Sequence, residues 1–236
     1  MDIGTTAISD PEVPVVRGSK RRDLVELSVG YALILVVLWT PRPWQRLTYC
    51  VAAVFIAIVL WNSFVGWKAI GLRKANFARS MWLDGVALLA ATVAAMVASR
   101  MHTLHLPGGP ILFVERYWGY VLFAFVQQFL LQGFFLSRLL WLTRSPGSAA
   151  LAAAAIFSLA HLPNPILTVM TFVWGLAACL LFLRYRNLYT LAIAHAILGI
   201  AIAITVPGPV IRNMRVGLGY LTYPSNRPDR PYHRIH

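Results

Sequence analysis

The sequence predicts an all-α fold, a polytopic transmembrane helix bundle of about seven spans, with about six to eight compatible with the pattern. Hydrophobic residues make up 58% of the 236 residues and charged residues only 12%, so a water-soluble globule would lack polar surface. The mean hydropathy is +0.66. Apolar runs long enough to cross a bilayer, which takes about 20 residues, recur along most of the chain. A β-barrel is excluded because its strands would alternate in polarity.

Seven spans are expected, with boundaries uncertain by about 2–4 residues. They are residues 24–40, 47–66, 80–99, 112–136, 149–161, 165–183 and 188–206. The fifth run is short, and Pro163 prevents it from continuing much further as a helix. Its small residues at 149–155 favour close packing against a neighbouring helix.

The ends of the chain predict the domain organisation. Residues 1–23 are expected to form a cytoplasmic tail, 24–206 the helix bundle, and 207–236 an interfacial segment with a disordered end. The net charge of +13 comes mainly from Lys and Arg at the ends of the apolar runs, which is typical of membrane topology and not of nucleic-acid binding. The distribution predicts a multi-pass protein with a cytoplasmic N-terminus, such as one in a bacterial inner (plasma) membrane.

Five polar side chains fall where lipid would otherwise be expected. Gln127, Gln128 and Gln132 lie in the fourth run, His161 ends the fifth, and His195 lies in the seventh. Buried polar groups in a membrane need partners or a wet cavity. Counted from the inner helix ends at 1.5 Å per residue, the first glutamine and the two histidines lie about 16, 20 and 12 Å deep. One such residue alone usually marks a helix contact, but five at matching depth predict a shared cavity.

Three short motifs in this region resemble those of a known family. Residues 127–133 read QQFLLQG, 157–161 read FSLAH, and 195–199 read HAILG. Their order and spacing resemble the CAAX protease and bacteriocin-processing family, also called the ABI family, over about residues 112–206. The family patterns are Glu-Glu-x-x-x-Arg-Gly, Phe-x-x-x-His and His-x-x-x-Asn. The second pattern matches fully, the first has glutamine at three positions, and the third has Gly199 in place of asparagine.

The resemblance implies roles for particular residues. The catalytic positions would be Gln127, His161 and His195, with supporting positions at Gln128, Gln132, Phe157 and Gly199. The family's first glutamate is thought to activate water, which an amide cannot do. Either histidine could accept the proton instead. The family's second glutamate and arginine can pair at i and i+4. Exchanging both for glutamine leaves a neutral pair that can hydrogen-bond to itself.

Two functions therefore stay open, beside an unrelated small transporter or structural membrane subunit; transport would favour repeat symmetry, which the sequence does not show. One is intramembrane proteolysis of membrane-associated proteins or peptides with altered chemistry. The other is a non-catalytic relative, a pseudoprotease that binds a peptide, lipid or protein partner in the cavity. The expected partners are membrane lipids and a membrane-anchored protein or peptide. No cofactor is indicated and the use of a metal is undecided; the loop pair His102 and His105 is interpreted as surface residues. Asp84 is a weaker candidate base.

Overall fold

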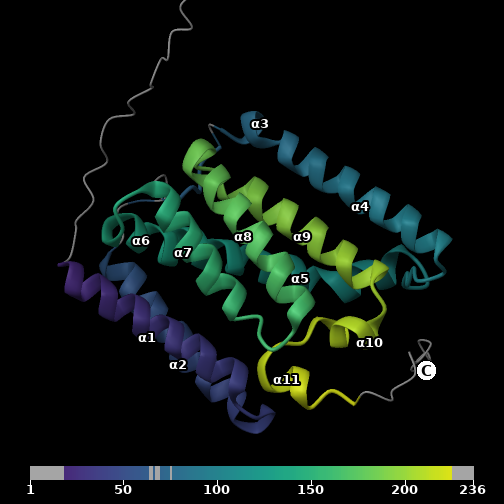
Figure 1. Cartoon of the computed structure of the whole chain (residues 1–236), viewed down its shortest axis with the longest axis horizontal. Helices are drawn as coiled ribbons and strands as arrows, with labels where there is room; N and C mark the ends of the chain where they lie inside the picture. Colours follow the sequence, from purple (N-terminus) through teal and green to yellow (C-terminus); the bar gives the residue numbers. More distant parts are fainter. Residues whose placement is uncertain (1–18, 64–65, 67–69, 75, 225–236) are drawn as a thin grey trace, which may run out of the picture.

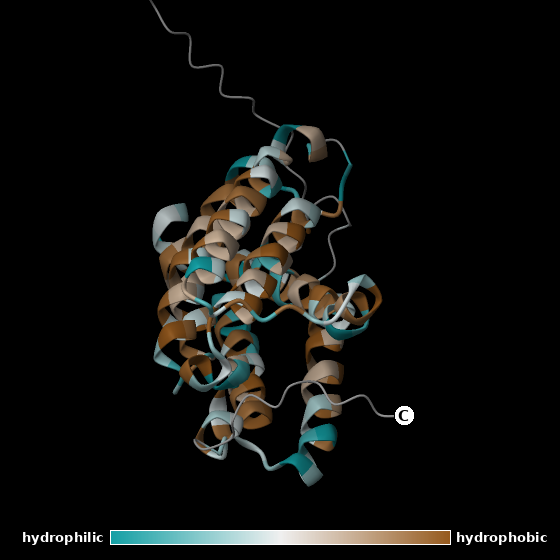
Figure 2. Cartoon of the chain, turned by 90° about the vertical axis from the view of Figure 1, so that its right-hand side faces the viewer, coloured by the Kyte–Doolittle hydropathy of each residue, from teal (hydrophilic) through white to brown (hydrophobic). Residues whose placement is uncertain are grey.

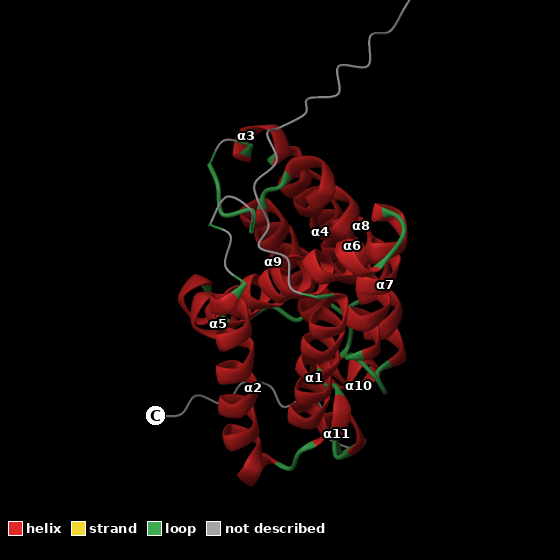
Figure 3. Ribbon diagram, turned by 90° about the vertical axis from the view of Figure 1, so that its left-hand side faces the viewer, coloured by secondary structure: helices red, strands yellow, loops and turns green. Residues whose placement is uncertain are grey.

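The computed structural model describes residues 19–63, 66, 70–74 and 76–224, and every regular element in these ranges is helical (Figure 3). The all-α prediction is confirmed. The elements are α1 (Lys20–Trp39), α2 (Arg42–Asn62), α3 (Phe77–Ser80), α4 (Trp82–Arg100), α5 (Pro110–Phe129), η1 (Leu130–Leu136), α6 (Ser137–Leu142), α7 (Pro146–Leu159), α8 (Pro165–Tyr185), α9 (Leu188–Thr205), α10 (Gly208–Ile211), η2 (Arg212–Met214) and α11 (Gly217–Leu221).

Five helical stretches in the described ranges are long and apolar enough to cross a membrane. They are Arg42–Asn62, Phe77–Arg100, Pro110–Leu142, Pro165–Tyr185 and Leu188–Thr205. Helix α7 is apolar but has only 14 residues, as expected from its short run. Helix α1 has 20 residues and begins with the charged sequence KRRD. Hydrophilic residues gather toward helix ends and connections, with apolar residues along the helices between them (Figure 2).

The fourth span is longer than expected. The predicted run ended near residue 136, but the helix continues through the π-helical turn η1 and into α6. The continuation is stabilised because the side chain of Arg138, only 5% exposed, pairs with Glu26 of α1. A cation that finds a carboxylate partner inside the bundle need not end the span.

Side-chain caps set several helix starts. Ser145 and Ser148 form a reciprocal capping box at the start of α7, with Pro146 at its first position. Asn164 caps α8 by accepting from the Leu167 backbone N–H at 3.2 Å. Asn187 caps α9 in the same manner. These caps fix where the short fifth and the sixth and seventh apolar runs begin.

Small residues bring helices α7 and α8 close together (Figure 1). The side chains of Ala149, Ala150, Ala153 and Ala154 are fully buried. A β-carbon added at Gly175 of α8 would lie 3.4 Å from the Ala154 Cα atom, so little space remains there. Helix α9 packs against both α4 and α5, and α1 pairs with α2.

The described part of the chain after Pro207 folds back onto the bundle. Asn164, which is completely buried, donates from Nδ2 to the carbonyl oxygens of Ile211 (2.9 Å) and Arg215 (3.1 Å). The Gly217 N–H donates to the carbonyl of Leu162 at 2.8 Å. The α7–α8 connection is therefore anchored to the C-terminal segment. Residues 225–236, where a disordered end was expected, lie outside the described ranges, as do residues 1–18 of the expected cytoplasmic tail.

Candidate active site

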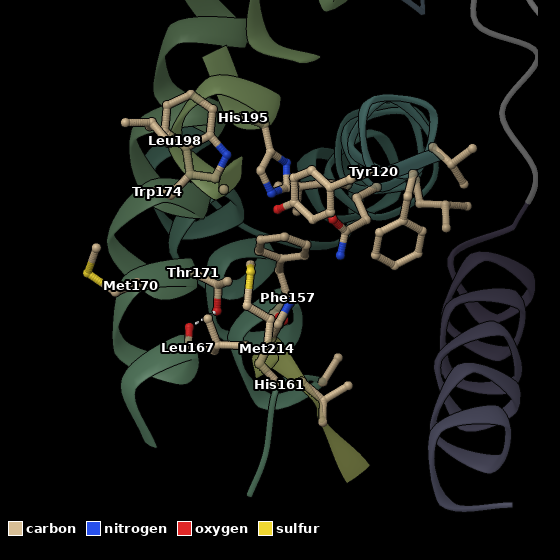
Figure 4. Close-up of a pocket in the computed structure, with 18 of the residues that line it drawn as sticks. Tyr120, Phe157, His161, Leu167, Met170, Thr171, Trp174, His195, Leu198 and Met214 are labelled. Carbon is tan, nitrogen blue, oxygen red and sulfur yellow. Dashed lines mark hydrogen bonds between the residues drawn. The ribbon is translucent and has the colours of Figure 1, made fainter. Parts of the chain in front are cut away.

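A cavity of about 1180 Å³ lies inside the bundle and is lined mainly by apolar side chains of α1, α2, α5, α8 and α9. Gln127, His161 and His195 all line it, so three residues selected from the sequence meet at one cavity. Figure 4 shows Phe157 between the two histidines. The centroid of its ring lies 5.0 Å from that of His161 and 6.0 Å from that of His195. A shared site is therefore geometrically feasible.

His195 is held by a pair of buried amides. Gln128 Nε2 lies 3.0 Å from His195 Nδ1, and Gln132 Nε2 donates to Gln128 Oε1 at 3.2 Å. Gln128 is completely buried, and Gln132 and His195 are 1% and 6% exposed. The neutral pair expected from the i, i+4 spacing is present, and it continues as a relay to the imidazole.

The relay sets which nitrogen of His195 carries the proton. In the amide orientation of the structure, Gln128 Oε1 accepts a hydrogen bond from Gln132, and Gln128 Nε2 donates one to His195 Nδ1. Nδ1 is then the acceptor, and the neutral ring carries its hydrogen on Nε2. His195 can therefore donate a hydrogen bond through Nε2 but cannot take up a proton there.

His161 has the opposite tautomer. At the end of α7, the backbone N–H of His161 bonds to the Ser158 carbonyl, and the Phe157 carbonyl instead receives the His161 side chain, with 2.8 Å to Nδ1. Because a carbonyl only accepts, Nδ1 carries the hydrogen and Nε2 has a free lone pair. A carbonyl in the last helical turn needs such a partner. His161 is thus the histidine in this cavity whose Nε2 can accept a proton.

The remaining candidates differ in position. Gln127 lines the cavity beside the fully buried Gln128. Asp84 lies against the backbone of Ala194 and is not among the residues lining the cavity. Within the described ranges, the lining contains no Asp or Glu side chain, and no three His, Cys, Asp or Glu side chains gather in a way that could hold a metal ion. His102 lies in the loop after α4.

Three residues near the site were not selected from the sequence. Tyr120 lies seven residues before Gln127, so both occupy one face of α5, a periodicity that could have suggested it. Trp174 packs its ring 5.9 Å from His195, and its buried Nε1 has no hydrogen-bond partner among the described residues. Asn164 holds the loop that carries His161, through backbone contacts more than 40 residues away that no local pattern could reveal.

The fold and site define an integral membrane protein with histidine and amide groups gathered in an intramembrane cavity. Residues 109–201 match the family described as type II CAAX prenyl endopeptidase, Rce1-like. The match covers all three motifs and confirms the resemblance seen in the sequence, so this region of the membrane protein is similar to CAAX proteases. No curated protein and no solved structure matches the chain significantly.

Proposed function

We propose that this protein is an intramembrane peptidase in which His161 replaces a carboxylate as the proton acceptor, and that it cleaves membrane-anchored proteins or peptides. The observation that carries the proposal is the 2.8 Å contact between His161 Nδ1 and the Phe157 carbonyl, because it leaves the Nε2 lone pair available at the cavity. The family match over residues 109–201 supports the same class of reaction.

The reaction follows from the two tautomers. His161 Nε2 takes a proton from a water molecule, and the resulting hydroxide attacks the scissile carbonyl carbon. Gln127 orients this water through its amide. The negative charge on the carbonyl oxygen is stabilised by the Nε2–H of His195, whose Nδ1 is held by Gln128. The protonated His161 then gives its proton to the departing amine nitrogen as the carbon–nitrogen bond breaks.

The test is cleavage of a membrane-anchored reporter by the purified protein in lipid. His161→Ala should lower turnover by about 10²- to 10⁴-fold, the usual contribution of a general base. His102→Ala, a histidine in the loop after α4, serves as the matched control and should leave turnover unchanged. Turnover that persists after His161→Ala would refute the proposed role.

A second candidate is a non-catalytic binder of a membrane peptide, lipid or protein partner. It is favoured by one observation, the amide at position 127 in a cavity whose described lining has no carboxylate. No cleavage across a broad panel of anchored substrates, with both His161 and His195 still required for binding a partner, would support it over the peptidase.

We also propose that the N-terminus is cytoplasmic, in a bacterial inner membrane. The Lys and Arg residues concentrated on the predicted inner side support this orientation. A cysteine introduced at the exposed Lys74 should react with an impermeant thiol reagent only from the cytoplasmic side, and one at Gly108 only from the outside. The unaltered chain gives the background from its own cysteines. The reverse labelling pattern would invert the topology.

A further inference from the structure

Residue 199 is a glycine, and a side chain from another helix occupies the space beside it. Gly199 lies one turn after His195 on α9, where the resemblance places an asparagine that would project a side-chain amide beside the histidine. Glycine has no side chain that could take this role. A β-carbon added here would collide with the hydroxyl oxygen of Tyr120 and would lie 2.5 Å from its Cζ atom and 2.6 Å from its Cε1 atom. The phenol of Tyr120 therefore occupies the space that a side chain at 199 would need.

Tyr120 reaches this space from α5, on the opposite side of the cavity from α8. Figure 4 shows its hydroxyl oxygen directed toward the region between His195 and Phe157. Tyr120 lines the cavity together with His195 and Gly199. The structure gives the hydroxyl no hydrogen bond to any residue in the described ranges. Tyr120 is only partly buried and lines the cavity, so its hydroxyl is available there as a hydrogen-bond donor to a ligand.

We propose that the Tyr120 hydroxyl takes over the hydrogen-bonding position of the missing asparagine and donates, beside the Nε2–H of His195, to the carbonyl oxygen of a bound peptide. The inference rests on the proposed function in that it assumes a peptide ligand, but it requires only carbonyl binding and not cleavage. Gly199 is then a necessary part of the arrangement, since any side chain there would displace the phenol.

A purely space-filling role for Tyr120 makes a different prediction. Its ring lies 6.5 Å from that of Phe123, so it also contributes to packing. If only the ring mattered, phenylalanine would serve equally well. Tyr120→Phe removes the hydroxyl and keeps the ring, and it separates the two roles. Tyr189→Phe, on α9 and not among the residues that line the cavity, is the matched loss of a hydroxyl.

The first experiment measures binding in lipid with two probes: a membrane-anchored peptide, and its analogue in which one backbone amide is reduced to a methyleneamine without the carbonyl. The unaltered protein and Tyr189→Phe should prefer the intact peptide. Tyr120→Phe should lose about 3- to 10-fold of that preference, the range for one hydrogen bond, with unchanged thermal stability. Where cleavage occurs, Tyr120→Phe should lower kcat by about 10²-fold or more with little change in KM.

The second experiment exchanges the two positions. Gly199→Asn alone should lower stability and binding because of the collision with the phenol. Tyr120→Ala alone should lower binding. The double variant Tyr120→Ala, Gly199→Asn should recover most of the preference for the carbonyl, since the amide can then donate from the vacated space. A double variant no better than the weaker single would overturn the inference.

The outcomes separate this inference from the proposed peptidase. Carbonyl preference that depends on Tyr120 in a protein that cleaves nothing would sustain the inference while the peptidase fails. Cleavage unaffected by Tyr120→Phe would sustain the peptidase while the inference fails. An unaltered protein that binds both probes equally well, or neither of them, would also overturn the inference.

Discussion

Two polar clusters each include residues of the continuous helical run from α5 to α6, and they stabilise buried polar groups in opposite ways. The amide relay, defined as Gln128, Gln132 and His195, is neutral and ends at the cavity. The charged cluster, defined as Glu26, Ser63 and Arg138, lies away from the cavity lining and joins α1 to α6. Arg138 also donates to the Phe134 carbonyl at 3.2 Å.

The difference separates a structural role from a chemical one. A buried ion pair is costly to break, because removal of one partner strands the other charge. The charged cluster can therefore fix the position of α1 against the bundle. A neutral relay carries no such penalty, but it determines the tautomer of the histidine at its end. In this protein a charged pair therefore holds two helices together, and a neutral amide pair positions the histidine at the cavity.

The largest expected effect is on the charged cluster. Glu26→Ala should lower the free energy of unfolding by about 3–5 kcal/mol, because Arg138 remains buried without its carboxylate. Thermal unfolding in detergent measures this loss. The double variant with Arg138→Met should recover most of it, since no charge is then stranded. Equal stability of the single and double variants would show that the pair does not act as a unit.

A smaller effect is expected when the neutral amide pair of the relay is replaced by a charged pair. Gln132→Arg alone should lower the unfolding free energy by about 3 kcal/mol, because it places an unpaired cation in a buried position. Adding Gln128→Glu should restore much of the stability by forming an i, i+4 ion pair. The same double variant should change the tautomer of His195, because the introduced carboxylate accepts from Nδ1–H. Nitrogen chemical shifts of His195 would report that change, and an unaltered tautomer would contradict it.

The smallest effect is expected at the cavity itself. Gln127→Glu should leave turnover within about 3-fold of the unaltered protein, because an introduced carboxyl group in an apolar surrounding stays neutral and cannot act as a base. Gln127→Ala should cost less turnover than His161→Ala. These three proteins are compared in the same reporter assay. A gain above about 10-fold from Gln127→Glu would show that the cavity already stabilises a carboxylate.

Much of the fold was predictable because a membrane span is recognised in the sequence as a long run of apolar residues. The apolar runs 165–183 and 188–206 correspond closely to α8 and α9. The extension of the fourth span to Leu142 was not predictable, since it depends on Arg138 meeting a carboxylate 112 residues earlier in the chain. Sequence periodicity describes one helix at a time and cannot identify that partner.

The same distinction holds at the site. The i, i+4 spacing of Gln128 and Gln132 predicted their hydrogen bond, because both lie on one helix. The contact between Gly199 and Tyr120 joins α9 to α5, and a glycine in a sequence gives no indication of which side chain fills its space. The tautomer of His161 depends on a backbone carbonyl at a helix end, whose position was uncertain by a few residues.

The π-helical turn Leu130–Leu136 has a consequence for insertions and deletions. It contains Gln132 and ends just before α6, so the number of its residues after Gln132 determines the angle between the amide relay and Arg138 of the charged cluster. Loss of one residue there would rotate α6 relative to α5 by about 100° and shorten the run by about 1.5 Å. Arg138 would then turn away from Glu26 while Gln128 stayed beside His195. A one-residue change in length after Gln132 would thus break the ion pair between α1 and α6 and leave Gln128, Gln132 and His195 in place.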